Sequence, residues 1–324
     1  MEKKKLLVTG ASGFLGSHIC DEAHDAGYEV HALIRKTSSQ RWLKKEWIKI
    51  HTCNLNDAHL IAPLLSQMYA VIHNAGVTSA RSEQEFYEVN VEASQLLAAE
   101  SAKAGVKRFI FVSSQAAGGP NNSPTPKLET DPDCPISAYG RSKKNAEERL
   151  FKFREKIHIA NLRYPAIYGP RNTEMLRVFR MLSGSFQIIM GMKPIYTSMI
   201  YVKDAARAAI AALEADYPSG SVYYITDGLN YTLQYIYDII SEVLHHRGIR
   251  ISLPFWIVEL AAWFESKFSK KPSSFNPEKV KEFKARFWVA SPRKAMDELA
   301  WAPKVLAREG FAETVKWYRI KRWI

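Results

Sequence analysis

The residues that decide the fold stand at the start of the chain: Lys5-Leu-Leu-Val-Thr9, followed by Gly10-Ala-Ser-Gly13-Phe-Leu-Gly16. The apolar run predicts a strand, and the pattern after the glycines predicts a helix. Gly10 allows a tight turn, Gly13 lets the backbone approach a ligand, and Gly16 lets the helix pack on the strand. Such a turn holds a pyrophosphate on the unpaired amides of the helix N-terminus. We therefore expect a dinucleotide-binding turn that uses Gly10, Ser12, Gly13, Phe14, Leu15 and Gly16.

The next segments alternate between strand and helix patterns. Strands are expected at residues 29–34, 48–52, 70–73, 109–113 and 158–163, and helices at 14–26, 58–67, 83–104 and 138–156. This alternation is typical of a parallel sheet whose crossover helices cover both faces. It predicts an α/β fold in which residues 1–170 form a Rossmann-type, doubly wound parallel sheet.

Beyond residue 170 the alternation loosens, and helices are expected at 173–183, 203–215 and 232–246. We expect residues 171–324 to form mainly a smaller, mostly helical substrate domain, with segments such as 198–215 packing back on the first domain. The stretch from Gly118 to Pro135 contains two glycines, five prolines and two asparagines, which predicts a loop and not a regular element.

The composition narrows the class of protein. The chain has 324 residues, 47% of them hydrophobic, which is enough for a core. Its net charge of +12 comes from scattered basic residues, so we expect an anionic small ligand and no nucleic acid. Three widely spaced cysteines favour neither a disulfide framework nor a metal site. No apolar stretch reaches the length of a membrane span. The sequence favours a cytoplasmic protein.

Tyr139-Gly-Arg-Ser-Lys143 places a tyrosine and a lysine four residues apart, on one face of a predicted helix. A nearby ammonium group, together with a positive cofactor ring, is expected to lower the pKa of the phenol from its usual value of about 10. Tyr139 can then exchange a proton with a substrate oxygen. Ser114 stands at the carboxyl end of the fifth predicted strand, directly after residue 113, and is expected to hold the same oxygen, with Ser113 as the runner-up.

These motifs resemble those of the extended short-chain dehydrogenase/reductase family, within the NAD-dependent epimerases and dehydratases, over most of the chain. The resemblance implies an NAD(P)-dependent enzyme whose catalytic residues are Ser114, Tyr139 and Lys143. It also implies cofactor contacts from Asn54, Leu55, Asn74, Ala75, Gly76, Ser113, Tyr139, Lys143, Pro165 and Ile167. Asn90 lies where the family has a helical asparagine, and either a functional or a structural role fits it.

The end of the second predicted strand distinguishes the two nicotinamide cofactors. NAD enzymes carry an acidic residue there, which binds the ribose 2′-hydroxyl. This chain has Arg35 and Lys36 and no acid. An arginine can hold a 2′-phosphate through two parallel hydrogen bonds. The sequence therefore favours NADP over NAD.

Two departures from family patterns bear on the reaction. Nucleotide-sugar epimerases usually carry an asparagine where this chain has Ala166, and sugar dehydratases carry Asp-Glu where it has Gln115-Ala116. The pattern resembles more closely the branch of 3β-hydroxysteroid dehydrogenases and dihydroflavonol reductases. We therefore expect an NADP-dependent oxidoreductase that interconverts a secondary alcohol and a ketone on a fairly apolar or ring-bearing small molecule. A nucleotide-sugar epimerase and a non-catalytic cofactor-binding regulator are the alternatives.

The C-terminal third contains two aromatic stretches. Residues 255–264 are apolar nearly all round a helix, which is typical of a core or a dimer interface and less often of a substrate wall or a lipid contact. Residues 317–323 are basic and aromatic, which favours a packed terminal helix over a helix resting on lipid. A homodimer and a peripheral lipid contact both stay open as partners.

Overall fold

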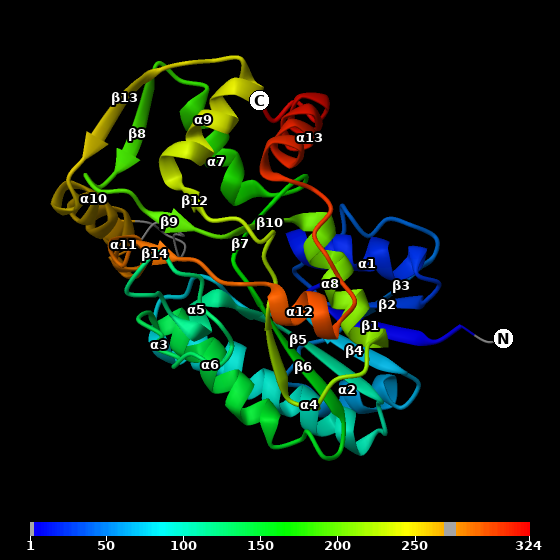
Figure 1. Ribbon diagram of the computed structural model, residues 1–324. Coiled ribbons are helices and arrows are strands. Elements are labelled where there is room, and N and C mark those ends of the chain that lie inside the picture. The colour runs from blue at the N-terminus through cyan, green and yellow to red at the C-terminus, as the bar shows by residue number, and fades with distance from the viewer. Residues whose placement is uncertain (1–2, 269–276) are drawn as a thin grey trace.

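The computed structural model describes residues 3–268 and 277–324 (Figure 1). Its centre is a parallel seven-stranded sheet with the order β11-β6-β5-β4-β1-β2-β3. The strands are β1 (Lys5–Thr9), β2 (Glu29–Ile34), β3 (Ile48–Thr52), β4 (Ala70–His73), β5 (Arg108–Ser114), β6 (His158–Tyr164) and β11 (Ser221–Tyr224). The predicted Rossmann-type sheet is confirmed, and the first four strands have the predicted bounds.

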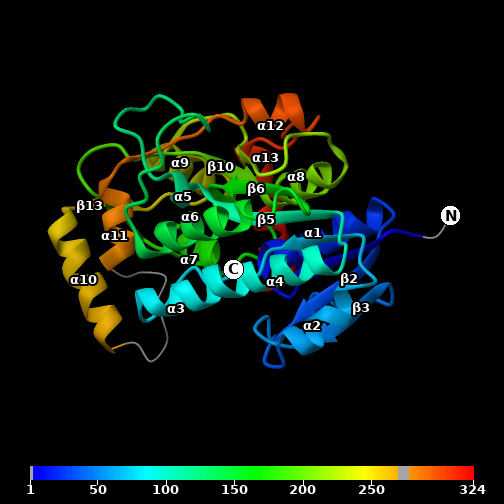
Figure 2. The same ribbon diagram turned by 90° about the horizontal axis from the view of Figure 1, so that it is seen from below.

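Helices cover both faces of this sheet (Figures 1 and 2). One face carries α1 (Phe14–Asp25) and α8 (Val202–Glu214), and the other carries α2 (Ala58–Leu65), α4 (Ala93–Lys103) and α6 (Ala138–Phe151). Side chains alternate along a strand, so Leu6 and Val8 enter the first core while Leu7 enters the second. All three are fully buried. This double burial explains the apolar runs within β1, β4 and β5.

The helix predicted at 83–104 is interrupted. It consists of α3 (Glu83–Tyr87), a π-helical turn (Glu88–Glu92) and α4. Asn90, inside the wider turn, exchanges two hydrogen bonds with the backbone of Val77, at 2.8 and 3.0 Å. Such turns are typically single insertions near functional sites. The next helix, α6, begins after its capping residue Ser137 and ends five residues earlier than expected.

The C-terminal part contains helices α7 (Thr173–Leu182), α9 (Leu233–Leu244), α10 (Phe255–Phe268), α11 (Pro277–Lys284), α12 (Arg293–Glu298) and α13 (Ala307–Ile320). Between them lie short strands that the sequence pattern did not indicate: β7 (Ala166–Tyr168) with β10 (Met199–Tyr201), β8 (Phe186–Met190) with β13 (Ile249–Leu253), and β9 (Tyr196–Thr197) with β12 (Tyr231–Thr232) and β14 (Phe287–Trp288). Residues 199–224 contact the large sheet through α8 and β11.

The aromatic tail is packed. Trp317 and Trp323 meet edge to face at 4.9 Å, and Trp323 stacks on Tyr318. The Tyr318 hydroxyl donates to the carbonyl of Asn172 at 2.6 Å, next to α7. The tail thus closes the side of the molecule where α13 lies against α9 (Figure 1).

Candidate active site

The glycine turn joins β1 to α1 and presses against the loop after β4. Gly10 has a φ of +63°, and a methyl group on it would lie 2.8 Å from the backbone of Ala75. A methyl group on Gly16 would lie 2.2 Å from the carbonyl oxygen of Gly10. The side-chain amide of Asn74 donates to that carbonyl at 3.2 Å. Only glycine fits these two positions.

The N-terminus of α1 fits a dinucleotide cofactor. Gly13 precedes the helix, supplies no capping side chain and is exposed, and the first turn contains no acidic residue. The first amide groups of a helix have no acceptor within it, and the helix dipole makes them attractive to anions. A pyrophosphate accepts hydrogen bonds from these amides and carries the negative charge that the dipole favours. Ser12, Phe14 and Leu15 belong to the same turn and lie beside these donors.

A buried polar chain ties β1 to β4 beneath this turn. Thr9 Oγ1 lies 2.7 Å from Nδ1 of His73, and Nε2 of that ring lies 2.8 Å from the hydroxyl of Ser94. The Ser94 hydroxyl donates in turn to the carbonyl of Asn90 at 2.7 Å. Burial lowers the pKa of His73 to about 3, so the imidazole is neutral near pH 7. The chain fixes the loop Asn74–Gly76 against the glycine turn.

Asn90 connects that loop with α6. Besides its two bonds to Val77, its amide donates to the hydroxyl of Ser142 at 3.0 Å, and Ser142 donates to the carbonyl of Tyr139 at 2.8 Å. Asn90 is buried, with 1% of its surface exposed. These contacts favour the structural role over the functional one.

The three residues predicted to be catalytic meet at the carboxyl end of β5. Ser114 is the last residue of β5, and Tyr139 and Lys143 lie in the first two turns of α6. The Ser114 side chain lies close enough to the phenol of Tyr139 to lower its pKa. Lys143 is buried and donates to the carbonyl of Val112 at 2.8 Å. A methyl group on Gly76 would lie 3.3 Å from its ammonium nitrogen, so Lys143 borders the loop predicted to contact the cofactor.

The phenol of Tyr139 titrates differently from our expectation. Burial raises its pKa to about 12; the neighbouring Ser114 side chain opposes this, and the carboxylates of Glu282 and Glu174 add to it. Burial also lowers the pKa of Lys143 to about 8. The expected lowering of the phenol pKa is therefore not produced by the protein's own groups.

Ser113, the runner-up for the third catalytic position, points the other way. Its hydroxyl donates to the carboxylate of Glu147 at 2.5 Å. Glu147 also accepts from Arg163 at 2.6 Å, and Arg163 makes a two-pronged contact with Asp133 at 2.6 and 2.8 Å. Arg163 is 2% exposed. The structure does not bring the Ser113 side chain to Tyr139, so a cofactor contact from this residue has to use its backbone.

Two glutamates that the sequence did not single out lie at the start of α6. Glu278 of α11 accepts from the backbone amide of Ala138 at 3.0 Å, and Glu282 accepts from the hydroxyl of Ser137 at 2.6 Å. They belong to α11, about 140 residues further along the chain. Their i, i+4 spacing on a helix was a signal, because it puts two carboxylates on one face. It did not indicate which element they contact.

The other predicted cofactor residues lie at the same edge of the sheet, since parallel strands end there together. Arg35 and Lys36 follow β2 and are exposed. Asn54 is exposed and Leu55 is half-buried after β3.

Pro165 and Ile167 follow β6, where β7 begins. Both are half-buried, and the Ile167 carbonyl accepts from the side chain of Asn172 at 3.0 Å. Ala166, between them, is exposed.

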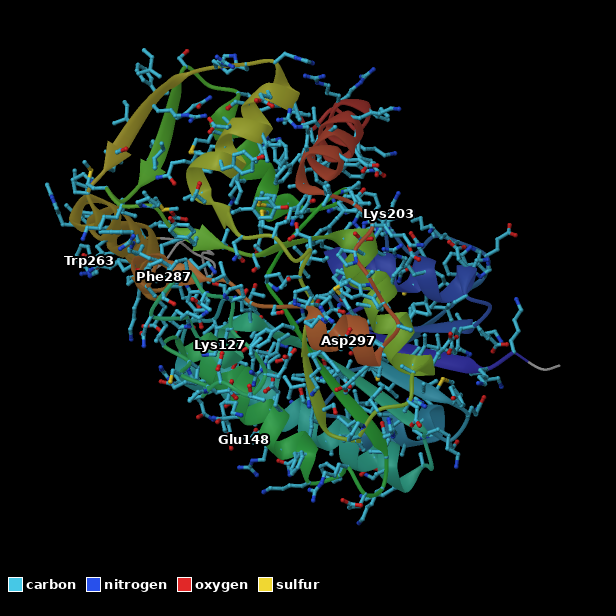
Figure 3. All side chains as sticks on the ribbon, in the orientation of Figure 1. Lys127, Glu148, Lys203, Trp263, Phe287 and Asp297 are labelled. Atoms are coloured by element: carbon cyan, nitrogen blue, oxygen red, sulfur yellow. The ribbon has the colours of Figure 1, made fainter. Side chains whose placement is uncertain are left out.

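The loop predicted between Gly118 and Pro135 is held by the C-terminal part of the chain. The backbone amide of Asn121 donates to the carbonyl of Phe287 at 2.8 Å, and that of Lys127 donates to Val289 at 2.9 Å. The buried Lys127 side chain donates to the Gly118 carbonyl at 2.5 Å. Figure 3 labels Lys127 and Phe287 on these segments. The loop is therefore ordered beside the trio by residues that lie far from it in sequence.

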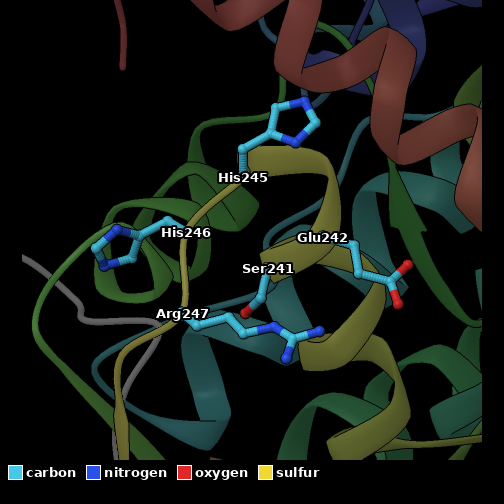
Figure 4. Close-up of a pocket in the computed structure, with 5 residues that line it drawn as sticks. All are labelled: Ser241, Glu242, His245, His246 and Arg247. Atoms are coloured by element: carbon cyan, nitrogen blue, oxygen red, sulfur yellow. The ribbon is translucent and has the colours of Figure 1, made fainter.

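One pocket lies away from these residues. It has a volume of about 480 Å³ and is lined by Ser241, Glu242, His245, His246 and Arg247, at the C-terminal end of α9 (Figure 4). The two histidine rings point in different directions, and Glu242 pairs with Arg308. None of the predicted site residues lines it.

Within residues 3–268 and 277–324, no cluster of histidine, cysteine or acidic side chains has a metal-binding arrangement. In the same part of the chain no helix is both long and apolar enough to cross a membrane.

Known proteins resemble the chain over two thirds or more of its length. Ceramide reductase of Caulobacter vibrioides is 28% identical over 98% of this chain and 96% of its own. Sterol-4-alpha-carboxylate 3-dehydrogenase (decarboxylating) of Dictyostelium discoideum is 28% identical over 69% of this chain and 72% of its own. The crystal structure of UDP-glucose 4-epimerase from Thermotoga maritima, with UDP-glucose, has a TM-score of 0.82 at 27% identity and covers 98% of this chain and 99% of that one.

The family model named NAD dependent epimerase/dehydratase family matches residues 6–226. This range includes the glycine turn, the predicted trio and the strands of the large sheet. The chain is thus a member of the NAD-dependent epimerase/dehydratase family, within the extended short-chain dehydrogenase/reductase superfamily.

Proposed function

We propose that the chain is an NADP-dependent oxidoreductase that interconverts a secondary alcohol and a ketone on a fairly apolar substrate. In this proposal the cofactor residues are those of the glycine turn and of the carboxyl edge of the sheet. Residues 171–324 supply most of the substrate contacts. The observation that carries the proposal is the meeting of Ser114, at the end of β5, with Tyr139 and the buried Lys143 in the first two turns of α6.

In this proposal each of the three residues has its own role. Bound at the glycine turn, the nicotinamide cofactor supplies or accepts the hydride. Tyr139, whose raised pKa keeps its proton near neutral pH, donates that proton to the ketone oxygen. Ser114 donates a hydrogen bond to the same oxygen and so holds it in place. Lys143 stabilises the phenolate that remains after the proton has left.

The preference for NADP rests on the end of β2. Arg35 and Lys36 are exposed there, and the residues next to them include no carboxylate that would repel a 2′-phosphate. NADPH should bind at least about tenfold more tightly than NADH. Arg35→Ala should narrow this difference, whereas Arg293→Ala, an exposed arginine on α12, should leave it unchanged. Equal affinities of the unmodified protein for the two cofactors contradict the proposal.

A nucleotide-sugar epimerase is the second candidate. The comparisons on their own favour it, because two solved structures that match nearly the whole chain at 26–27% identity are UDP-sugar epimerases. The relatives named for ceramide and sterol reactions favour the oxidoreductase. So does Ala166, since a methyl group cannot donate the hydrogen bond to the diphosphate that the family's asparagine provides.

Cofactor stoichiometry separates the two candidates. Alcohols, ketones and UDP-sugars should be supplied in turn while the absorbance of the reduced nicotinamide is followed. We expect one NADPH consumed per ketone reduced, and no conversion of UDP-sugars. Interconversion of UDP-sugars without net consumption would establish the epimerase.

Tyr139→Phe tests the chemistry common to both candidates. It removes only the hydroxyl, so NADP should still bind while turnover falls by about 10²-fold or more. Tyr87→Phe on the neighbouring α3 is the matched control and should keep full turnover. Full activity of Tyr139→Phe would show that the proton comes from another group.

A further inference from the structure

The two faces of α10 differ in what they contact. The inner face carries Val258 and Ala262, which pack on Val280 of α11. The opposite face carries apolar residues about one helical turn apart, each between 46% and 74% exposed: Trp256, Leu260, Trp263, Phe264 and Phe268. We call these five residues the outer stripe. Trp263 lies at the margin of the molecule in Figure 3.

The neighbouring strands extend this apolar region. Exposed Phe186 and Ile188 of β8 pair with exposed Ile249 and Ile251 of β13. The end of β13 leads directly into α10, at the same end of the molecule in both ribbon views (Figures 1 and 2). Of the eighteen large apolar side chains that the described residues leave exposed, ten lie in β8, the turn after it, β13 and α10. Such a concentration marks an interaction surface.

The charge of this region is positive. Residues 247–268 and 277–290 contain seven lysines and arginines against four glutamates. Lys267 lies over the ring of Trp263, 4.8 Å from its centre, so its ammonium group is next to the outer stripe. Exposed Lys281 and Lys284 lie on α11, which packs against α10. The exposed apolar region thus has a basic border.

We propose that the outer stripe docks on the surface of an anionic lipid bilayer, with α10 lying in the plane of the interface. Tryptophan and phenylalanine side chains partition into this layer, and lysines beside them reach the anionic headgroups. A second copy of the chain fits the stripe less well, because a two-fold interface would bring the same positive charges together. The positive charge beside the outer stripe therefore favours binding to anionic lipid over self-association.

This docking would place the active site close to the membrane. α11 packs against α10 and holds the N-terminus of α6 through Glu278 and Glu282. Tyr139 is the second residue of α6. An apolar substrate dissolved in the bilayer would then reach the trio from the docked side. The docking itself holds whichever reaction the trio performs.

Flotation with lipid vesicles tests the proposal without any measurement of activity. The full chain should float with vesicles that contain phosphatidylglycerol, less with pure phosphatidylcholine, and less again as salt is added. Leu260→Glu should lower the bound-to-free ratio by about tenfold or more, since it removes an exposed leucine that the bilayer would bury and adds a charge that the anionic lipid repels. Leu60→Glu is the matched control, because Leu60 on α2 is 57% exposed and Leu260 is 50% exposed.

A second variant distinguishes weaker lipid binding from misfolding. Lys267→Glu changes only an exposed charge and should also weaken flotation on anionic vesicles, while its melting temperature stays that of the unmodified protein. Sedimentation of the protein without lipid tests whether the outer stripe binds a second copy of the chain instead. The proposal would be overturned if the protein did not float with the vesicles, or if Leu60→Glu and Leu260→Glu reduced flotation equally. It would also be overturned by a dimer that Leu260→Glu dissociates and Leu60→Glu does not.

Discussion

The two ends of α6, the helix that carries Tyr139 and Lys143, are held by different means. Toward its C-terminal half, Glu147 is locked to Arg163 and Ser113, which come from the buried sheet. At its N-terminus, Ser137 and Ala138 contact glutamates of α11, a helix with a largely exposed surface. The first end belongs to the core of the sheet, and the second depends on a peripheral helix. The position of the lysine is thus a property of the fold, whereas the surroundings of the tyrosine are open to adjustment.

Arg163→Met should have the largest effect. It leaves the carboxylates of Glu147 and Asp133 without their shared cation, and breaking a buried pair in this way costs about 3–5 kcal/mol. The free energy of unfolding in urea should fall by this amount. Arg141→Met is the control, because Arg141 pairs with Glu83 at 2.9 Å on the exposed side of the same helix, where a pair contributes about 1 kcal/mol or less. Equal losses would refute the distinction between the two ends.

The buried network should also govern acid stability. Burial alone would raise the pKa of Asp133, but hydrogen bonds from Arg163 and Lys144 outweigh it, so the net pKa lies below its usual range. A carboxyl whose folded pKa is depressed stabilises the fold fully above its unfolded pKa of about 3.9, and this stabilisation is lost as the pH falls through the folded value.

Unfolding titrations should therefore show stability falling below about pH 4, this group contributing a slope of up to ~1.4 kcal/mol per pH unit. Asp133→Asn should flatten the curve in that window. Asp297→Asn, at an exposed carboxylate on α12 paired with Arg293, should change it little. An identical slope for Asp133→Asn and the unmodified protein would count against the network.

At the other end of α6, Ser137→Ala should cost about 0.5–2 kcal/mol, the range for a lost helix cap. Ser137 accepts from the amide of Gly140 at 3.1 Å and donates to Glu282. Ser82→Ala is the control, since Ser82 caps the exposed helix α3 at 3.2 Å. Ser137→Ala should be the more damaging of the two because it also leaves Glu282 without its serine donor. Matching losses in thermal melts would mean that the α11 contact adds no stability.

The smallest effect is expected from Glu282→Gln. The negative charge of Glu282 contributes to the raised pKa of Tyr139, so its removal lowers that pKa. The basic limb of the pH–rate profile should move to lower pH while binding of NADP stays the same. Glu259→Gln, at an exposed carboxylate on α10 paired with Lys284, should leave the profile in place. A shift in KM without a shift in the profile would make Glu282 a purely structural contact.

The sequence predicted the strands of the large sheet well. β1, β2 and β4 have the expected bounds because each contains a short apolar run, and both faces of such a strand are buried. The bounds of the edge strand β3 also match, although that strand is only partly buried. The trio stays a prediction: Tyr139 and Lys143 match the spacing of the family motif and share one helical face, and Ser114 was chosen at the end of a strand, at the edge where ligands bind. The structure brings these three residues together.

The contacts of α11, the π-helical turn and the shortest strands could not be predicted in the same way. Glu278 and Glu282 have the pattern of a solvated helix face, and their partners lie about 140 residues away. The π-helical turn depends on the bond between Asn90 and Val77, which no helical periodicity reveals. Strands of two or three residues, such as β9, exist only through pairing with distant neighbours. Nonlocal contacts of this kind leave no periodic signal in the sequence.

The long-range bonds of the loop at residues 118–135 have a consequence for how the protein is made. Ribosomes release the chain from its N-terminus at about 5–20 residues per second. Strands β1 to β6 are complete once residue 164 has emerged, but Asn121 and Lys127 bond to residues 287–289. On the order of ten seconds separates these two moments. A nascent chain thus has its glycine turn early and can hold the loop beside the trio only after residues 287–289 have emerged.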